Sequence, residues 1–360
     1  MEQSGLGAGP IEDVAPLLGG TQNILLRFRR GDRCFVLRRP PQHPSGNGAD
    51  TLRREAQLLV ALAATDVPHP ALIACCASDA VIGAPFYLME EVAGFNATNG
   101  LPSLHANSAD LRGRMGFAVI EAIGRLARVD YRAVGLDGFG NPDGYLERQV
   151  GRWRAQLDGY ARFANWPGQG SLPDVKRLAD WLDTNRPQSF VPGIMHGDYH
   201  LANVMFRYDG PEIAAIVDWE LATIGDPLVD LGWVMATWPD ADGVSPTGTS
   251  VEPWQGFPMS DELVAFYEAT TGRAHCAPQW YAVLACYKLG ILLEGVNPTS
   301  RIGPFFEGAR QGNQYLDRKG LHYRAGWAGS AAAAILGGGW AGKARFIRSI
   351  RSRRSRSGSV

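Results

Sequence analysis

The sequence predicts an α+β protein with two lobes: a small N-terminal lobe built on an antiparallel sheet with one helix, and a larger, mainly helical C-terminal lobe. Residues 24–39 alternate apolar and polar positions around the turn pair Gly31-Asp32, which is typical of two antiparallel strands. Residues 49–65 carry leucine and alanine at helical spacing. From about residue 108 onward, most apolar runs are long and have the helical period.

The remaining elements follow from the same patterns. Residues 85–94 form a buried-looking strand that ends at a glycine, and the linker between the lobes is expected near 90–95. A strand-like run covers 212–220, and helical patterns cover 115–129, 145–163, 173–185, 226–238, 260–271 and 278–295. We therefore expect an N-lobe over residues 1–92, a C-lobe over 93–328 and a basic, disordered tail over 329–360.

Composition excludes several classes of protein. With 45% hydrophobic and 20% charged residues, the chain has the composition of a folded globular protein rather than a disordered or fibrous one. The net charge of -1 points to no particular partner. The five cysteines form no CxxC pair, which indicates a reducing compartment and no structural zinc. No secretory signal and no apolar run of about 18 residues is found, so a cytoplasmic location is expected.

The last part of the chain, residues 329–360, differs from the rest in composition. It begins with small residues and ends with seven Lys or Arg among Ser and Gly. Such a tail is a candidate for contact with an anionic surface, either a nucleic acid or a membrane. The alternative is an appendage that contributes nothing to activity, and no nucleic acid is expected to be required for activity.

The stretch GIMHGDYHLANVMF places four polar residues, His196, Asp198, His200 and Asn203, within eight positions. Zinc prefers closed sets of His and Cys, and no fourth ligand is close in sequence. A serine or cysteine nucleophile is disfavoured because no Gly-x-Ser-x-Gly elbow accompanies the stretch. The spacing His-x-Asp-x-x-x-x-Asn is that of a kinase catalytic loop, in which Asp meets the acceptor hydroxyl and Asn holds magnesium. The alternative is a loop whose Asp and Asn satisfy their own backbone turns.

A second motif favours the phosphotransfer interpretation. The strand-like run IAAIVDWE delivers Asp218 at its C-terminal end, where a second magnesium-binding carboxylate is required. Asp198 is therefore predicted as the catalytic residue, and Asn203 and Asp218 as metal ligands. Glu220 is expected to support the site indirectly. His196 and His200 are expected to be structural, and Asp226 and Asp230 are expected to cap or tether a helix.

HGDYHLANVMF together with IVDWELATIGDPLVDLGWVM resembles the aminoglycoside phosphotransferase and choline kinase family, a branch of the protein-kinase-like fold. Within that family, the second motif is similar to that of kinases related to those fused to acyl-CoA dehydrogenases. Motif support runs from about Leu17 to about Arg301. The resemblance implies a two-lobed protein-kinase-like fold and transfer of the γ-phosphoryl group from ATP, with Mg²⁺, to a hydroxyl group. GTP is not excluded as the donor.

Phosphoryl transfer requires backbone donors and a cation for the nucleotide phosphates. The candidate phosphate loop consists of Gly19, Gly20, Thr21, Gln22 and Asn23. Its alternative is a simple hairpin turn.

The cation is where this sequence departs from the kinase pattern, because there is no lysine before Lys176. An arginine must fill the role, and CFVLRRPP offers Arg38 and Arg39. Strand alternation places Val36 on the same face as Arg38. By resemblance, the small residue two positions before the cation lines the adenine pocket, so Arg38 is the preferred candidate.

The resemblance also assigns other nucleotide contacts. Glu55 is the helical acid expected to pair with the cation, and its alternative is a solvated surface glutamate. In YLMEEVAG, Met89 would lie behind the adenine, and the backbone carbonyl of Glu90 and amide of Val92 would meet its edge. A plain core strand is compatible with the same residues.

The acceptor is less clearly encoded. Carboxylates in the stretch 240–268 would suit an aminoglycoside: Asp240, Asp242, Glu252, Asp261, Glu262 and Glu268. Basic residues further on would suit an acidic or acyl-bearing compound: Lys288, Arg301, Arg310, Arg318 and Lys319. We expect a small hydroxylated metabolite, with a hydroxyacyl-CoA as the favoured example. An aminoglycoside or other antibiotic O-phosphotransferase and a non-catalytic nucleotide-binding scaffold remain alternatives. The oligomeric state is not predicted.

Overall fold

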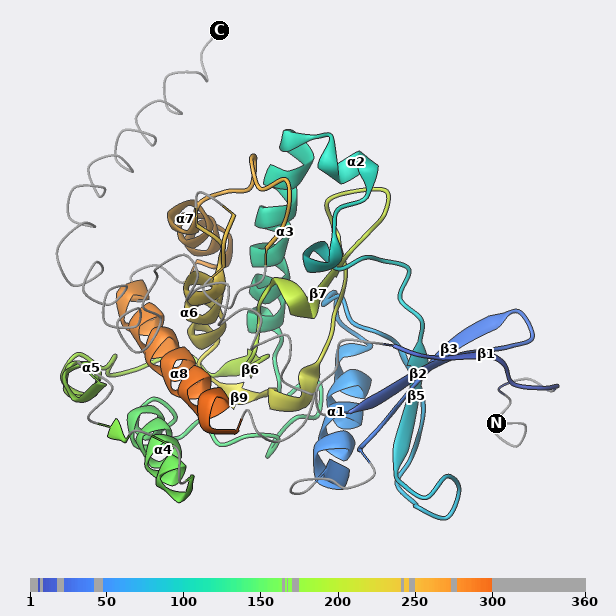
Figure 1. Cartoon of the computed structure of the whole chain (residues 1–360), viewed down its shortest axis with the longest axis horizontal. Helices are drawn as coiled ribbons and strands as arrows, with labels where there is room; N and C mark the ends of the chain where they lie inside the picture. Colours follow the sequence, from blue (N-terminus) through green and yellow to red (C-terminus); the bar gives the residue numbers. More distant parts are fainter. Residues whose placement is uncertain are drawn as a thin grey trace, which may run out of the picture. The chain divides into compact units, whose positions relative to one another are not determined.

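The structure is a computed structural model of the 360-residue chain. It describes residues 6, 9–17, 23–41, 48–163, 166, 168–169, 175–240, 243–245, 250–272 and 277–299. The chain forms two compact units: Met1–Tyr145 with Phe190–Ala274, and Leu146–Ser189 with His275–Val360 (Figure 1). The predicted lobe boundary between residues 92 and 93 stays a prediction, and the predicted tail lies outside the described residues.

The first unit contains a five-stranded antiparallel sheet with strand order β1-β2-β3-β5-β4. Its strands are β1 Glu12–Pro16, β2 Ile24–Arg30, β3 Arg33–Arg39, β4 Leu72–Cys76 and β5 Phe86–Glu90. The predicted hairpin over residues 24–39 is confirmed, and Gly31 adopts a φ of 59° in its two-residue turn. The edge strands β1 and β4 were not predicted. All five residues of β1 are exposed, so its sequence has no buried face to detect.

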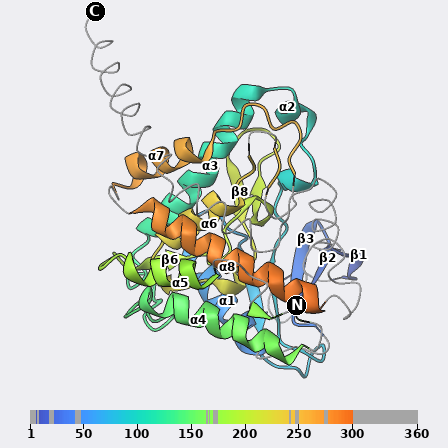
Figure 2. The same ribbon diagram turned by 60° about the vertical axis from the view of Figure 1, so that its left-hand side comes forward.

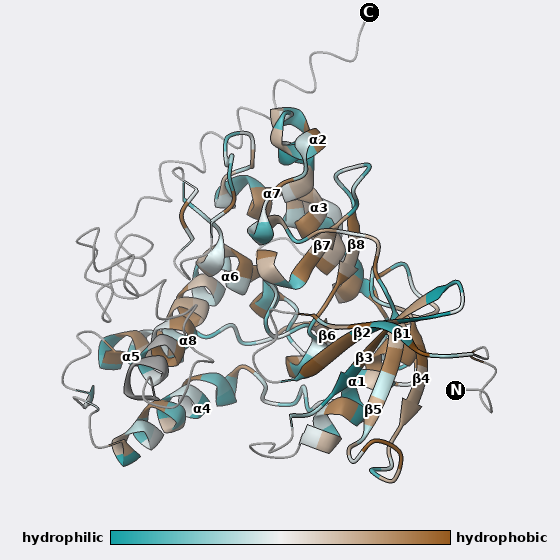
Figure 3. Ribbon diagram, turned by 45° about the vertical axis from the view of Figure 1, so that its right-hand side comes forward, coloured by the Kyte–Doolittle hydropathy of each residue, from teal (hydrophilic) through white to brown (hydrophobic). Residues whose placement is uncertain are grey.

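The two faces of this sheet have different partners. One face carries the apolar cluster of Phe28, Phe35 and Leu88. Because side chains alternate along a strand, Arg38 lies on the opposite face. That face is covered by helix α1, Gly48–Leu62, which contacts β4 and β5. Figure 3 shows both hydrophilic and hydrophobic residues along α1, as expected for a helix with one buried side.

Two short, two-stranded antiparallel sheets follow in the same unit. Strand β6, Gly193–Met195, pairs with β9, Thr223–Gly225, and β7, Val204–Phe206, pairs with β8, Ile213–Ile216. The accompanying helices are α2 Ser103–Ala106, α3 Ala109–Arg128, α6 Leu228–Thr237 and α7 Ser260–Thr271. Helix α3 contacts β6 and β8. The buried Tyr199 hydroxyl donates to the Val119 carbonyl at 2.8 Å, so α3 anchors the segment between the two short sheets.

The second unit consists of helices α4 Glu147–Asp158, α5 Val175–Thr184 and α8 Pro278–Thr299. These helices lie against one another (Figures 1 and 2), and the Trp280 Nε1 donates to the Leu182 carbonyl at 2.9 Å. The helices predicted along the chain are therefore confirmed, and the fold class is α+β as predicted. In the part of the chain that the structure describes, no helix combines the length and apolarity needed to cross a membrane.

Candidate active site

The β7–β8 pair brings the two predicted metal ligands together. Asn203 directly precedes β7 and Asp218 lies two positions after the end of β8, while Val204 and Ile216 are partners across the ladder. The Val217 amide donates to the Asn203 carbonyl at 3.0 Å. Because the strands are antiparallel, Asn203 and Asp218 lie at the same end of the pair. Asp218 has a φ of 67°, an uncommon value for a residue other than glycine and one that often marks a functional position.

The predicted catalytic residue lies next to Asn203. The Asn203 side-chain amide donates to the Asp198 carbonyl at 2.9 Å and to its carboxylate Oδ2 at 3.3 Å. The His200 Nε2 lies 3.5 Å from the same Oδ2. The Asp198 side chain is 31% exposed, so the carboxylate is oriented by its neighbours and still accessible to another molecule.

The backbone of this loop is held by Asp230 of α6. The amide of His196 donates to Asp230 Oδ2 at 2.6 Å, and the amide of Gly197 donates to Oδ1 at 2.8 Å. Gly197 has a φ of 85°, and a Cβ at this position would lie 2.5 Å from the Leu221 carbonyl oxygen. Asp230 thus tethers α6 to the loop, while Asp226 accepts from the Leu228 amide at 3.1 Å and so satisfies a free amide at the start of the helix. These are the two kinds of role expected for them.

His196 connects the loop to the segment that carries Asp218. Its ring Nε2 lies 2.9 Å from the Val217 carbonyl, and its Nδ1 accepts from the Asp198 amide at 3.3 Å. These partners assign the proton to Nε2 in a neutral ring. Burial lowers the pKa of His196. His200 caps the next short turn by accepting from the Ala202 amide at 3.2 Å. Both histidines have the structural contacts expected of them.

Asn96 also supports the loop, and it was not predicted from the sequence. Its side-chain amide donates to the carbonyls of Ala202 at 2.6 Å and Val204 at 3.1 Å. Its carbonyl oxygen accepts from the Thr98 amide at 2.9 Å. A single asparagine in a loop most often serves a local turn, so this long-range role had no pattern to reveal it.

Arg38 joins the sheet, α1 and the segment after β8. Its Nε lies 2.8 Å from Glu55 Oε2 in a close ion pair, and its Nη2 donates to Glu55 Oε1 at 3.1 Å. The same Nη2 donates to Asp218 Oδ1 at 2.8 Å and lies 3.3 Å from Glu220 Oε2. Glu55 is 1% exposed, so the surface alternative is excluded. Arg39 points elsewhere, with its Nε donating to the Pro40 carbonyl. The structure therefore brings together Arg38 and Glu55 as predicted.

Three carboxylates compete for this one guanidinium. Burial disfavours the charged form of Arg38, but Glu55, Tyr87 and Asp218 outweigh it and raise the pKa of Arg38. Burial raises the pKa of Glu55 although Arg38 opposes this. Burial and the charge of Asp218 raise the pKa of Glu220 to about 7. Three carboxylates thus lie around one guanidinium, and repulsion from Asp218 adds to burial in raising the pKa values of Glu55 and Glu220.

Tyr87 is a further member of this cluster that the sequence did not identify. Its hydroxyl donates to Glu55 Oε2 at 2.8 Å. It lies directly opposite Arg38 in the β3–β5 ladder. Burial, followed by the charge of Glu55, raises the pKa of Tyr87 well above its ordinary value. The register of the two strands would have revealed this residue, but a single strand does not.

The other predicted nucleotide contacts are placed only in part. The Asn23 side-chain amide donates to Glu220 Oε2 at 2.9 Å, so the end of the predicted phosphate loop reaches the cluster. Buried Val36 and half-buried Met89 are partners across the β3–β5 ladder, with Glu90 at the end of β5 and Val92 two residues later. The rest of the predicted phosphate loop lies outside the described residues: Gly19, Gly20, Thr21 and Gln22.

The donor set at the end of the β7–β8 pair suits magnesium. Among the described residues, no group of three or more His, Cys, Asp or Glu side chains forms a metal site by itself. Magnesium needs only one or two protein ligands, because water and phosphate oxygens complete its coordination. A carboxylate from Asp218 and an amide oxygen from Asn203 fit this requirement.

Most basic residues proposed for the acceptor lie outside the described residues: Arg301, Arg310, Arg318 and Lys319. Lys288 is described and is buried in α8. Its Nζ lies 5.5 Å from the centre of the Trp153 ring, a cation–π contact within the second unit.

Comparison with known proteins agrees with this geometry. The model of a family described as the phosphotransferase enzyme family matches residues 13–262. Acyl-CoA dehydrogenase family member 10 of Mus musculus is 34% identical over 225 residues, which is 62% of this chain and 20% of that protein. Acyl-CoA dehydrogenase family member 11 of Pongo abelii is 29% identical over 288 residues, which is 79% of this chain and 36% of that protein. The chain thus spans only a fraction of the length of these curated relatives.

Solved structures show the same fold. A candidate aminoglycoside phosphotransferase from Ralstonia eutropha JMP134 is 27% identical, with a TM-score of 0.71 over 90% of this chain and 94% of the other. Aminoglycoside phosphotransferase APH(4)-Ia, in a ternary complex with AMP-PNP and hygromycin B, has a TM-score of 0.55 at 17% identity over 92% of this chain and 95% of the other. At this identity the second likeness concerns the fold alone.

Proposed function

Because the chain belongs to the phosphotransferase enzyme family, we propose that it transfers the γ-phosphoryl group of ATP, with Mg²⁺, to a hydroxyl group of a small molecule. One observation carries this proposal: Asp198, Asn203 and Asp218 lie together at one end of the β7–β8 pair, with Arg38 in contact with Asp218. Phosphoryl transfer requires a carboxylate that meets the acceptor hydroxyl, oxygen ligands for a magnesium ion and a cationic side chain for the phosphate groups.

Asp198 is proposed as the catalytic residue. Its carboxylate receives a hydrogen bond from Asn203 and remains accessible, so it is able to orient an acceptor hydroxyl and take its proton as the new bond forms. Asp218 and Asn203 are proposed to hold magnesium. When bound, the metal ion would neutralise charge on the phosphate groups. A divalent cation at this place would relieve the repulsion between Asp218 and the neighbouring Glu220.

Arg38 is proposed as the phosphate-binding cation in place of a lysine. A guanidinium presents several N–H donors in a fixed fork, so it can hold Glu55 with some of them and a phosphate oxygen with another. The predicted phosphate loop, residues 19–23, and the predicted adenine contacts Met89, Glu90 and Val92 belong to the same proposal. The contact between Asn23 and Glu220 supports the position of the loop.

Adenine and guanine are both candidates for the base of the donor nucleotide. A structural neighbour, APH(4)-Ia, has been solved with AMP-PNP, and another, aminoglycoside 2'-phosphotransferase-IIIa, has been solved with GDP. Both likenesses concern the fold alone. We keep ATP as the proposed donor and GTP as the competitor to be tested beside it.

For the acceptor, we propose a small hydroxylated metabolite, with a hydroxyacyl-CoA as the favoured example. The names of the curated relatives support this choice, since they are acyl-CoA dehydrogenase family members 10 and 11. An aminoglycoside is the second candidate, favoured by the name of the Ralstonia eutropha structure. The cytoplasmic location is part of the proposal and is supported by the free cysteines among the described residues.

An acceptor screen tests the proposal. The purified full chain is incubated with γ-labelled ATP or GTP, Mg²⁺ and either 3-hydroxyacyl-CoA compounds or aminoglycosides, and phosphorylated product is measured. Transfer to a hydroxyacyl compound is expected, with a turnover about 100 to 10,000 times lower in Asp198→Asn because the carboxylate no longer accepts the proton. Asp137→Asn, a change at an exposed residue that contacts none of the proposed site residues, serves as the control.

The results separate the alternatives. Transfer to aminoglycosides alone would contradict the acyl acceptor but keep the phosphotransferase. Equal turnover in Asp198→Asn and the wild type would contradict the catalytic role of Asp198.

A further inference from the structure

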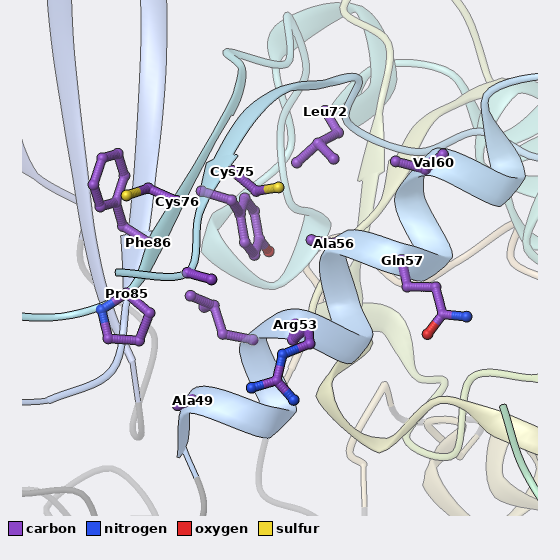
Figure 4. Close-up of a pocket in the computed structure, with 13 residues that line it drawn as sticks. Ala49, Arg53, Ala56, Gln57, Val60, Leu72, Cys75, Cys76, Pro85 and Phe86 are labelled. Carbon is purple, nitrogen blue, oxygen red and sulfur yellow. The ribbon is translucent and has the colours of Figure 1, made fainter. Parts of the chain in front are cut away.

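A cavity of about 260 Å³ lies between α1 and strands β4 and β5, away from the residues proposed for transfer (Figure 4). Its walls are mostly apolar and include Leu52, Ala56, Val60, Leu72, Pro85 and Phe86. Ligand cavities commonly measure about 300 to 1,000 Å³, so this one suits a small ligand. Asp198, Asn203, Asp218, Arg38 and Glu55 are not among the lining residues.

The lining residues contributed by α1 extend along the helix from Ala49 to Val60. Ala49 and Arg53 lie at one end in Figure 4, and Val60 and Leu72 lie at the other. Ala49 and Val60 are roughly 16 Å apart along the helix axis at the usual rise per residue. Val60 is 63% exposed although it is apolar, which places an open apolar edge at that end. The length of this lining and its apolar side chains fit a short hydrocarbon chain.

One end of the cavity has a charged side chain, that of Arg53. Of the 13 described residues that line it, Arg53 alone carries a charge at neutral pH, and Gln57 adds an amide nearby. Arg53 Nη1 lies 2.5 Å from Asp50 Oδ1 in an ion pair. A guanidinium has five N–H donors, so it is able to bind Asp50 and a second anion together. The complementary ligand has an apolar chain and one anionic end.

The cavity shares Tyr87 and helix α1 with the cluster around Arg38, which consists of Arg38, Glu55, Tyr87, Asp218 and Glu220. The ring of Tyr87 belongs to its wall, while the Tyr87 hydroxyl donates to Glu55 at 2.8 Å. Leu52 and Ala56 line the cavity from the same helix that carries Glu55. A ligand in the cavity would therefore pack against both elements that hold Glu55 in place beside Arg38.

We propose that this cavity is a second ligand site, which binds a small alkyl carboxylate with its chain along α1 and its carboxylate at Arg53. Occupation steadies α1 and Tyr87 and thereby favours the pairing of Glu55 with Arg38. The existence of the site does not depend on the proposed phosphotransfer. Only its effect on nucleotide affinity rests on that function.

Protection of a cysteine tests the site directly. Cys75 lines the cavity and is exposed, whereas half-buried Cys34 on β3 is not among the lining residues. The full chain is alkylated with iodoacetamide, with and without octanoate, and modification of each cysteine is followed by mass spectrometry. Octanoate at ten times its dissociation constant is expected to slow alkylation of Cys75 about tenfold by mass action and to leave Cys34 unchanged.

Matched ligands and variants test the recognition. 1-Octanol, which has the same chain without the charge, is expected to protect less than octanoate. Arg53→Gln is expected to weaken octanoate binding by about tenfold, the loss of one charge-assisted contact. Arg33→Gln, an exposed change on β3 outside the cavity, is expected to leave binding unchanged. Absence of protection by octanoate, or equal affinity in Arg53→Gln and the wild type, would overturn the site.

The effect on the nucleotide is measured separately. The affinity for AMP-PNP and Mg²⁺ is expected to rise by about two- to tenfold when octanoate is present, within the usual range of coupling between sites. An unchanged AMP-PNP affinity would overturn the coupling through Tyr87. A protein that bound octanoate but no nucleotide would contradict the proposed function while the second site stood.

Discussion

The two halves of the candidate active site are built on different physical principles. The loop of residues 196–203 is fixed through its backbone, which donates to Asp230 and accepts from Asn96. The Arg38 cluster is instead made of charged side chains from β3, α1 and the segment after β8. The loop therefore depends on buried supports that take no part in the chemistry. The cluster depends on the balance of charge around one guanidinium.

This contrast predicts the largest effect at Arg38. Removal of Arg38 leaves Glu55 buried without its cation, so Arg38→Ala is expected to destabilise the protein by about 3 to 5 kcal/mol. Arg39→Ala is the matched control and is expected to cost less than about 1 kcal/mol, because Arg39 has no carboxylate partner among its hydrogen bonds. Urea denaturation measures both.

The cluster also offers a compensating change. Arg38→Met combined with Glu55→Leu removes both buried charges and is expected to recover much of the lost stability, with nucleotide binding still impaired. If Arg38→Ala cost no more than Arg39→Ala, the buried ion pair would not be a structural element of the cluster.

The next largest effect is expected at Asp230, which holds the backbone of the loop of residues 196–203. Asp230→Ala leaves the amides of His196 and Gly197 without their acceptor, and a loss of about 2 to 4 kcal/mol is expected because each buried unsatisfied group costs about 1 to 3 kcal/mol. Asp226→Ala removes the acceptor of one amide, that of Leu228 at the start of the same helix, and is expected to cost about 1 kcal/mol. Thermal or urea unfolding gives both values, and turnover should fall only in Asp230→Ala. Equal losses of stability in the two variants would contradict the role of Asp230 in holding the loop.

The smallest expected effect concerns pH and His196. Burial lowers the pKa of His196, so the unfolded chain binds a proton at a higher pH than the folded protein does. Its neutral form is therefore favourable above the ordinary histidine pKa of about 6.5, and stability falls as pH drops below that value. Denaturation at pH 8 and pH 5.5 is expected to show a smaller decrease for His196→Asn than for the wild type. Identical decreases would contradict a buried, neutral His196.

The sequence predicted those parts of the fold that have a period. The hairpin over residues 24–39 and the helices were identifiable because their apolar positions repeat. Strands β6 and β9 have three residues each, which is too short for alternation to be visible. Strand β1 is wholly exposed, and its pairing with β2 gives its sequence no apolar face.

The residues of the candidate active site likewise fall into two groups, those with a local sequence pattern and those without one. Asp198, Asn203 and Asp218 were found because their spacing is local, and Arg38 was chosen over Arg39 by strand alternation together with the family resemblance, which places a small residue two positions before the cation. Asn96 contacts residues more than 100 positions away, and Tyr87 depends on the register between β3 and β5. Such partners are set by tertiary structure, so a single sequence contains no pattern for them.

The central claim is that Asp218, with Asn203 and Arg38 beside it, forms a site for a magnesium nucleotide. Calorimetric titration of ATP and of GTP, each with and without Mg²⁺, into the wild type and Asp218→Asn tests it most directly, with Asp137→Asn as the control. The account predicts Mg²⁺-dependent binding in the wild type and the control, and a loss of at least about tenfold in affinity, or about 1.4 kcal/mol, in Asp218→Asn. Absence of nucleotide binding, or binding that ignores both Mg²⁺ and the substitution, would contradict it.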